Sequence, residues 1–133
     1  MPRRAAAMKR AKAMTRTIVK KNRAKVTAEE RNARKIVRQR SQDHCEIGLG
    51  CIATEVHHRM NRSQGGSWNP SNLLHLCASH HSHVTTHPQA AREQGWAVAS
   101  HQDPARTHVW LSGRGFVFLT DDGQITDSED EVA

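Results

Sequence analysis

The chain contains no tyrosine and few other aromatic residues. Two phenylalanines and three tryptophans occur among 133 residues, and hydrophobic residues make up 36% of the chain. Such a composition is too polar for one packed core of this length, so we expect part of the chain to be solvated. No stretch approaches the roughly 20 apolar residues of a membrane span, and the first residues lack the apolar segment of a secretory signal. We therefore expect a cytoplasmic protein without membrane contact.

Charges of opposite sign are concentrated at the two ends of the chain. Residues 1–40 contain 15 Lys and Arg against two acids, whereas residues 121–133 contain six acids and no basic residue. Residues 41–120 are formally neutral and hold all ten histidines and all three cysteines. We therefore expect a basic, partly helical or disordered arm, a central domain and an acidic, disordered tail. The arm predicts contact with a polyanion, above all DNA; the alternative is a solvated tail.

Local patterns predict short helices and strands. Thr27 and Glu30 match a capping box, which predicts a helix over residues 28–38 with an apolar side formed by Ala33, Ile36 and Val37. Strands are predicted at residues 52–56, 72–76 and 96–98, and a helix over residues 80–93 that Gly95 ends. Residues 109–111 and 116–119, on either side of a glycine-rich turn, predict a C-terminal β-hairpin.

The cysteines indicate a metal site. An odd number of cysteines argues against a closed set of disulfides. Cys45 and Cys51 are separated by five residues, and Cys77 and His80 form a C-x2-H pair. Thiolates and an imidazole in two such pairs can hold one tetrahedral Zn²⁺, and the two glycines between Cys45 and Cys51 would let the wider loop close. The alternative is three reduced thiols without metal.

An adjacent histidine pair, His57 and His58, follows the β-prone segment. Neighbouring side chains of a strand point to opposite faces, so a local bend would have to turn both rings toward one phosphate. Hydrolysis of a phosphodiester needs a water, a base that takes its proton and a cation near the leaving oxygen. A neutral imidazole can act as that base. Asn72, or a backbone carbonyl near it, could fix the tautomer of the base.

The order of these motifs resembles the HNH endonuclease family, most closely small proteins of actinobacterial phages and their hosts. The resemblance covers roughly residues 44–98 and rests on these pairs and triplets: His57-His58, Gly65-Gly66, Asn72-Leu73-Leu74, Leu76-Cys77 and His80-His81. It implies a ββα-metal core with a zinc staple, meaning one structural Zn²⁺ that fixes two segments of the chain together. With the basic helical arm and the C-terminal hairpin added, the predicted fold class is α+β.

The resemblance also implies a role for each site residue. His58 would be the general base, and Asn72 would orient it and pin the loop. His57 and His81 would bind the catalytic divalent ion, which is Mg²⁺, Mn²⁺ or another metal. The zinc staple would consist of Cys45, Cys51, Cys77 and His80. Two features differ from the family pattern, which more often has cysteine at position 80 and a closer first cysteine pair.

The remaining polar residues receive simpler predictions. Arg59 and Arg62 flank the histidine pair, and we expect them to contact phosphate; plain solvation is the alternative. His75 alternates with two leucines, which predicts a position on the more solvated face of its strand. His83 is expected to point away from the site.

The sequence therefore predicts a metal-dependent HNH endonuclease that hydrolyses DNA phosphodiester bonds. The enzyme would act in phage DNA processing or packaging in the cytoplasm of a bacterial host, with terminase or portal proteins as further partners. The alternative is a zinc-stapled DNA-binding module without catalysis. The combination of His57, His58, Asn72 and His81 favours the enzyme, because a binding module has no need of it.

Overall fold

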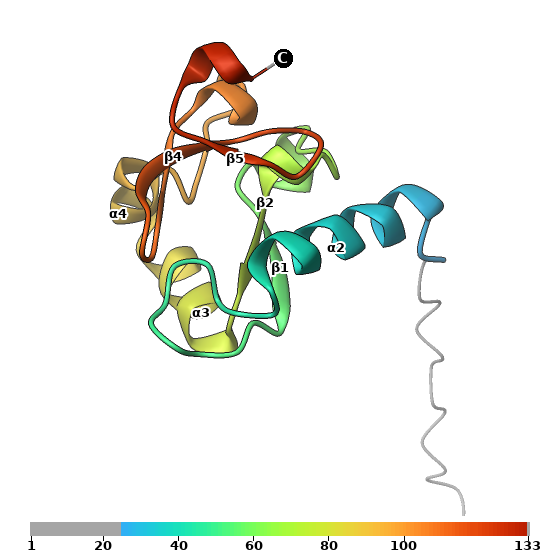
Figure 1. The fold of residues 1–133 in the computed structure, drawn as a ribbon, viewed down its shortest axis with the longest axis horizontal. Helices are drawn as coiled ribbons and strands as arrows, with labels where there is room; N and C mark the ends of the chain where they lie inside the picture. The colour runs from blue at the N-terminus through green and yellow to red at the C-terminus, as the bar shows by residue number, and fades with distance from the viewer. Residues whose placement is uncertain (1–24, 133) are drawn as a thin grey trace, which may run out of the picture.

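A computed structural model describes residues 25–132 of the chain (Figure 1). It is an α+β structure in which short helices accompany one two-stranded and one three-stranded antiparallel sheet. Most of the predicted basic arm, residues 1–24, lies outside the described residues. Across residues 25–132, no helix combines the length and the apolar character needed to cross a membrane.

Helix α2, Ala28–Ser41, begins at the predicted capping residue. Thr27 accepts a hydrogen bond from the Glu30 backbone N–H (3.1 Å). Ala33 and Val37 are buried in a cluster with Leu73. The predicted boundary at residue 40 is therefore wrong, because α2 covers part of the core and belongs to the folded domain rather than to an arm.

The first sheet pairs strand β1, Glu55–His58, with strand β2, Leu73–Leu76. Its register sets His57 opposite Leu74 and His58 opposite Leu73. The strand starts later than predicted, since Ile52 makes only an isolated bridge with His44. Two 3-10 turns, η3 (Arg62–Gln64) and η4 (Pro70–Asn72), lie in the connection. Helix α2 lies on one side of the pair, and helix α3, Ala78–Thr86, on the other (Figure 1).

The single helix predicted over residues 80–93 forms as two helices, α3 and α4 (Pro88–Glu93). The break falls at His87, whose ψ is 67°, because a proline disfavours helical backbone at the residue before it. Gly95 follows α4 with a φ of +75°, and a Cβ there would lie 1.9 Å from the His108 carbonyl oxygen. Only glycine fits that position without a shift of the backbone.

Residues 96–98 do not form the predicted strand. The backbone N–H groups of Trp96 and Ala97 both donate to the Ala91 carbonyl (2.8 and 3.1 Å), so they close the end of α4 instead of joining a sheet. The second sheet consists of β3 (Val109–Leu111), β4 (Gly115–Leu119) and β5 (Ile125–Thr126), in that order. The 3-10 turn η5, Pro104–Arg106, precedes it.

The acidic end of the chain is not the disordered tail predicted for residues 121–133. Ile125 lies opposite Leu119 in the pairing of β5 with β4, and it packs against the core. Beyond it, Glu129–Glu131 form the 3-10 turn η6, and Glu129 lies 3.5 Å from Arg106. Hydrophobic burial of one isoleucine and backbone pairing therefore attach a segment whose composition alone suggests disorder.

The main core lies between the two sheets. Its fully buried aliphatic residues come from both: Leu74, Leu76, Val109, Leu111, Val117 and Leu119. At its edge, Arg40 of α2 and Glu46 form a buried ion pair (2.8 Å), and Arg40 also donates to the Leu73 carbonyl (2.7 Å). Glu46 accepts in turn from the His75 backbone N–H (2.8 Å). This network fixes the start of the Cys45–Cys51 loop to α2 and β2.

Candidate functional site

The three cysteines and His80 come together as predicted. Their ligand atoms all lie within 4.8 Å of one another, and over residues 25–132 no other group of three or more His, Cys, Asp or Glu meets that criterion. Cys45 and Cys51 lie at the two ends of one loop, whereas Cys77 caps α3 and His80 lies in its first turn. A group of three thiols and one imidazole could hold a metal ion such as zinc.

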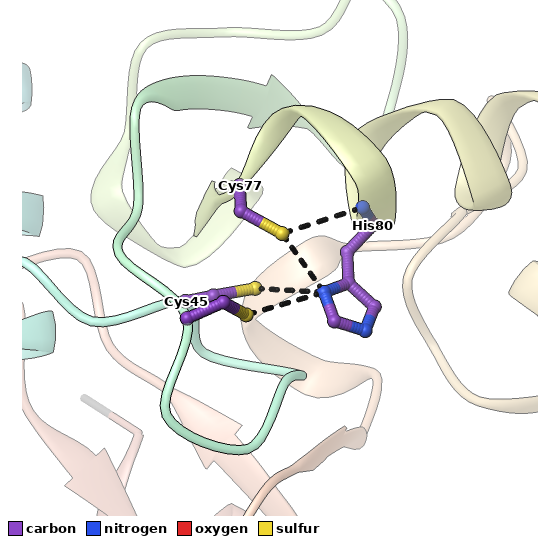
Figure 2. A group of neighbouring side chains, drawn as sticks. Cys45, Cys77 and His80 are labelled. Carbon is purple, nitrogen blue, oxygen red and sulfur yellow. Dashed lines mark hydrogen bonds between the residues drawn. The ribbon is translucent and has the colours of Figure 1, made fainter.

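His80 is the centre of this group. Its Nδ1 atom lies 2.9 Å from the Cys77 sulfur, 3.4 Å from that of Cys51 and 3.5 Å from that of Cys45. Figure 2 shows the thiols of Cys45 and Cys77 turned toward this ring. A Cβ at Gly48 would lie 2.4 Å from the Cys51 sulfur and 2.6 Å from the His80 ring. The wide loop thus closes onto the site because glycine occupies position 48.

Two of the thiols have shifted acidity. Burial and contacts with the other two cysteines raise the pKa of Cys51 to about 11. Burial also acts to raise the pKa of Cys77, but hydrogen bonds from the His80 backbone and ring outweigh it and lower that pKa to about 6. The lowered pKa of Cys77 favours its thiolate, the form in which cysteine binds metals.

His57 and His81 form a second, smaller group on the α3 side of β1. Their ring centroids are 5.2 Å apart, with an angle of 63° between the planes. The Nε2 atom of His57 lies 2.8 Å from the Trp96 carbonyl, and Nδ1 of His81 lies 2.6 Å from a carboxylate oxygen of Glu55. Each of these partners accepts a hydrogen bond, so each ring has one protonated nitrogen engaged. In the neutral rings, Nδ1 of His57 and Nε2 of His81 retain their lone pairs.

Burial keeps His57 uncharged. Its side chain lies in the interior, and burial, together with the charges of His81, His58 and Arg59, lowers its pKa to about 4, although the hydrogen bond to Trp96 acts in the opposite direction. A neutral imidazole is the form that binds metals. A cavity of about 410 Å³ adjoins His57 and has several polar side chains in its wall: Asn61, Gln64, Thr85 and Arg92.

His58 lies on the α2 side of β1, away from the pair that His57 forms. Its ring meets Trp68 edge to face, with 4.4 Å between the centroids. Its Nε2 atom is buried and has no hydrogen-bond partner in residues 25–132. Burial, with the charges of Arg62 and Arg34, lowers its pKa. The strand runs without a bend through His58, so the bend that would turn both rings the same way does not occur within β1.

Asn72 holds the loop that joins β1 to β2. Its Oδ1 accepts from the Met60 N–H (2.8 Å), and its Nδ2 donates to the carbonyls of Met60 (3.2 Å) and Ser67 (3.0 Å). The side chain therefore has the loop-pinning contacts that the resemblance implies. Both N–H groups of its amide are used in this way, and the side chain makes no hydrogen bond to His58 in the described chain.

The guanidinium of Arg59 is already used within the fold and is not available for the predicted phosphate contact. Its side chain is buried, and its guanidinium donates to backbone carbonyls of five residues: Gly95, Ser71, Pro104, Thr107 and His108. Burial and the charge of Arg40 lower its pKa to about 9. Arg59 thus ties together three loops, while Arg62 remains exposed beside His58.

Sequence reasoning missed two parts of the site and misplaced one histidine. Glu55 contacts His81, and its position two residues before His57 on a strand is the signal that could have found it. The Trp96 carbonyl has no sequence signal, because it depends on how the chain leaves α4. His75 is buried, not solvated, and its Nδ1 lies 2.7 Å from the Ser41 hydroxyl. His83 is exposed and stacks on His87, away from His81.

Comparison with protein-family models, with curated proteins and with solved structures gives no significant match for this chain. The resemblance to the HNH family therefore remains a prediction from the motifs.

Proposed function

We propose that the chain is a metal-dependent endonuclease of the HNH type that hydrolyses phosphodiester bonds of DNA. The observation that carries the proposal is the paired arrangement of His57 and His81. Each ring donates from one nitrogen to a fixed acceptor, the Trp96 carbonyl or the Glu55 carboxylate. Metal-ligating histidines almost always have such a partner, because it fixes the tautomer and the ring orientation.

The free nitrogens of His57 and His81 would hold one divalent cation. Two imidazole donors suit Mn²⁺, Ni²⁺, Co²⁺ or Zn²⁺ better than Mg²⁺, which prefers oxygen ligands. A divalent ion at this position supplies positive charge for the phosphate and its leaving oxygen. The cavity beside His57 offers room for that phosphate, and Arg92 in its wall offers a countercharge.

His58 would accept the proton of the attacking water. Its lowered pKa keeps the imidazole neutral at pH 7, and its Nε2 atom has no partner in residues 25–132. A buried nitrogen without a partner suits an acceptor whose donor arrives with the substrate. His57 and His58 lie on opposite faces of β1. The scissile phosphate would therefore have to lie at the end of the strand, next to its last residue, His58, where groups from both faces can reach it.

The cluster of three cysteines and His80 would be a structural zinc staple. Cys45, Cys51, Cys77 and His80 supply four donors and leave no open position, which is typical of structural zinc. The ion would join the Cys45–Cys51 loop to the start of α3. It would thereby hold α3, which presents His81, against β1, which presents His57.

Plasmid cleavage tests the proposed function. We expect zinc-loaded protein to cut supercoiled plasmid when Mn²⁺, Ni²⁺, Co²⁺ or Mg²⁺ is added, and to stop when a chelator removes the added ion. His81→Ala and His58→Ala should each lower the cleavage rate about 10²–10⁴-fold, whereas His83→Ala, an exposed histidine of the same helix, should cleave normally. Folded, zinc-loaded protein that binds DNA but cuts it with none of these metals would overturn the proposal in favour of a DNA-binding module without catalysis.

The biological setting follows from the resemblance alone. A nuclease of this type would serve phage DNA processing or packaging in the bacterial cytoplasm, with terminase or portal proteins as partners. Co-purification of this chain with a large terminase subunit or a portal protein from infected cells would support that setting.

A further inference from the structure

Two arginines from distant parts of the chain meet at one aromatic ring beside His58. The guanidinium carbon of Arg34 lies 5.1 Å from the centroid of Trp68, and that of Arg62 lies 5.5 Å from it. The same ring meets His58 edge to face at 4.4 Å. Arg34 belongs to α2 and Arg62 to the turn η3, so the contact depends on the fold and not on sequence spacing.

Trp68 is itself fixed in place. It is half-buried and packs against the cluster of Ala33, Val37 and Leu73, which joins α2 to β2. A guanidinium over an indole ring is held by a cation–π interaction that leaves its N–H donors free to bind an anion. The ring therefore holds both arginines close to His58 without using their hydrogen-bonding groups.

The charges of this group are not balanced. Glu30 is the one acidic residue that forms an ion pair with either arginine in the described chain, and it lies 3.7 Å from Arg34. Arg62 forms no ion pair with any of residues 25–132, and both arginines act on His58 as positive neighbours. Two cations held together with so little compensation favour an anion that both can reach, and phosphate matches the fork of the guanidinium group.

We propose that Arg34 and Arg62 bind one backbone phosphate of DNA beside His58, and that Trp68 is the positioning residue for both. The proposal rests on the proposed function and deepens it, since it brings α2 to the reacting phosphodiester. Helix α2 thereby gains a second role, because its apolar side supports the core and its Arg34 contacts the substrate.

Arg38 provides a matched control. It lies one helical turn after Arg34 on the same helix, it is exposed, and it contacts Asp43 (3.3 Å) rather than Trp68. Replacing either arginine with glutamine removes the same charge from the same helix. A difference between Arg34→Gln and Arg38→Gln therefore reports the position at Trp68, not the net charge.

The experiment measures the binding of full-length, zinc-loaded protein to a labelled DNA duplex at several salt concentrations, with no further divalent metal added. We expect Arg34→Gln and Arg62→Gln each to weaken binding and to reduce the slope of log K against log[salt] by about 0.9, the value for one phosphate contact. The double variant should lose little more than either single variant, because both arginines serve one phosphate. Trp68→Leu should weaken binding in the wild type but not in the double variant.

Two results would overturn the inference: Arg34→Gln behaving as Arg38→Gln does, or the effects of Arg34→Gln and Arg62→Gln adding in full, which would mean separate contacts. Zinc content and thermal unfolding, measured on each variant, ensure that the compared proteins are folded. The outcome is separate from that of the cleavage assay. If the wild type cuts plasmid but Arg34→Gln binds DNA as Arg38→Gln does, only this inference is removed. If DNA binding depends on Arg34 but the wild type does not cut, only the proposed function is removed.

Discussion

The Nδ1 atom of His81 lies 2.6 Å from a carboxylate oxygen of Glu55. The contact joins α3 to β1, and Glu55 shares a face of that strand with His57, two residues further on. A carboxylate that accepts from one imidazole nitrogen fixes the tautomer of the ring and leaves the lone pair on the other nitrogen. In the proposed metal pair, Glu55 would therefore prepare His81 to act as a ligand together with His57.

Replacing Glu55 by glutamine tests this relationship. Glu55→Gln keeps the size of the side chain but removes its charge, so we expect affinity for the added divalent metal to fall about 10–100-fold. Calorimetric titration with Mn²⁺ or Ni²⁺ measures that affinity, and cleavage should require correspondingly more metal. Bound zinc should not change. Glu93→Gln, at an exposed residue of α4, is the control, and equal metal affinity in the two variants would contradict the role of Glu55.

The features that the sequence predicted well are those with short-range physical causes. The cap at Thr27 and the apolar side of α2 follow from helical spacing. The two ligand pairs, Cys45 with Cys51 and Cys77 with His80, follow from local spacing and chemistry, whereas the fold brings the two pairs together. The fold adds what spacing cannot supply, namely which loop carbonyls surround a side chain and which helix covers a strand.

Arg59 illustrates the limit of prediction from local sequence patterns. An arginine beside a histidine pair has the sequence signature of a phosphate contact, yet here its guanidinium is enclosed by carbonyls from three loops. No local pattern encodes those carbonyls. The same holds for Ile125, which attaches an acidic segment to the core because the fold places it opposite Leu119 of β4.

Arg59 is therefore expected to contribute to stability and not to DNA affinity. Arg59→Met would leave buried carbonyls without donors, and we expect it to lower the free energy of unfolding by about 2–4 kcal/mol. Arg62→Met, on the exposed neighbour, should change it by less than about 0.5 kcal/mol. Urea unfolding of both variants measures the difference. Equal stability of the two variants would show that the carbonyl contacts of Arg59 are dispensable.

The zinc staple has its own test. Purified protein should contain about one zinc ion per chain, and Cys77→Ser should lose it and unfold at a lower temperature, because a structural zinc contributes directly to folding. Cys77 also caps α3 by accepting from the His80 N–H (3.5 Å), a role that serine fills well. A lower melting temperature therefore reports the metal and not the cap. The staple would be refuted if the wild-type protein, as purified, were folded, contained no zinc and melted at the same temperature as Cys77→Ser.

The buried imidazole of His57 makes stability depend on pH. Burial and nearby positive charge lower the pKa of His57 to about 4, below the 6.5 of a free histidine. As the pH falls below 6.5, the unfolded chain takes up a proton that the folded chain refuses, so the folded state loses stability until about pH 4. For a complete transition the loss from this one residue is about 3 kcal/mol.

The variant His57→Gln isolates that contribution, because glutamine can still donate to the Trp96 carbonyl but does not titrate. We expect its free energy of unfolding, measured by urea titration between pH 7 and pH 4, to fall less steeply than that of the wild type. His58 and His75, whose pKa values are also lowered mainly by burial, and Cys77, whose pKa is lowered to about 6, titrate in both proteins and cancel in the comparison. His83→Gln, which removes an exposed histidine, should keep the wild-type slope. If His57→Gln kept it as well, His57 would be open to solvent and protons, and a ring of that kind would not hold the fixed tautomer on which the proposed metal pair depends.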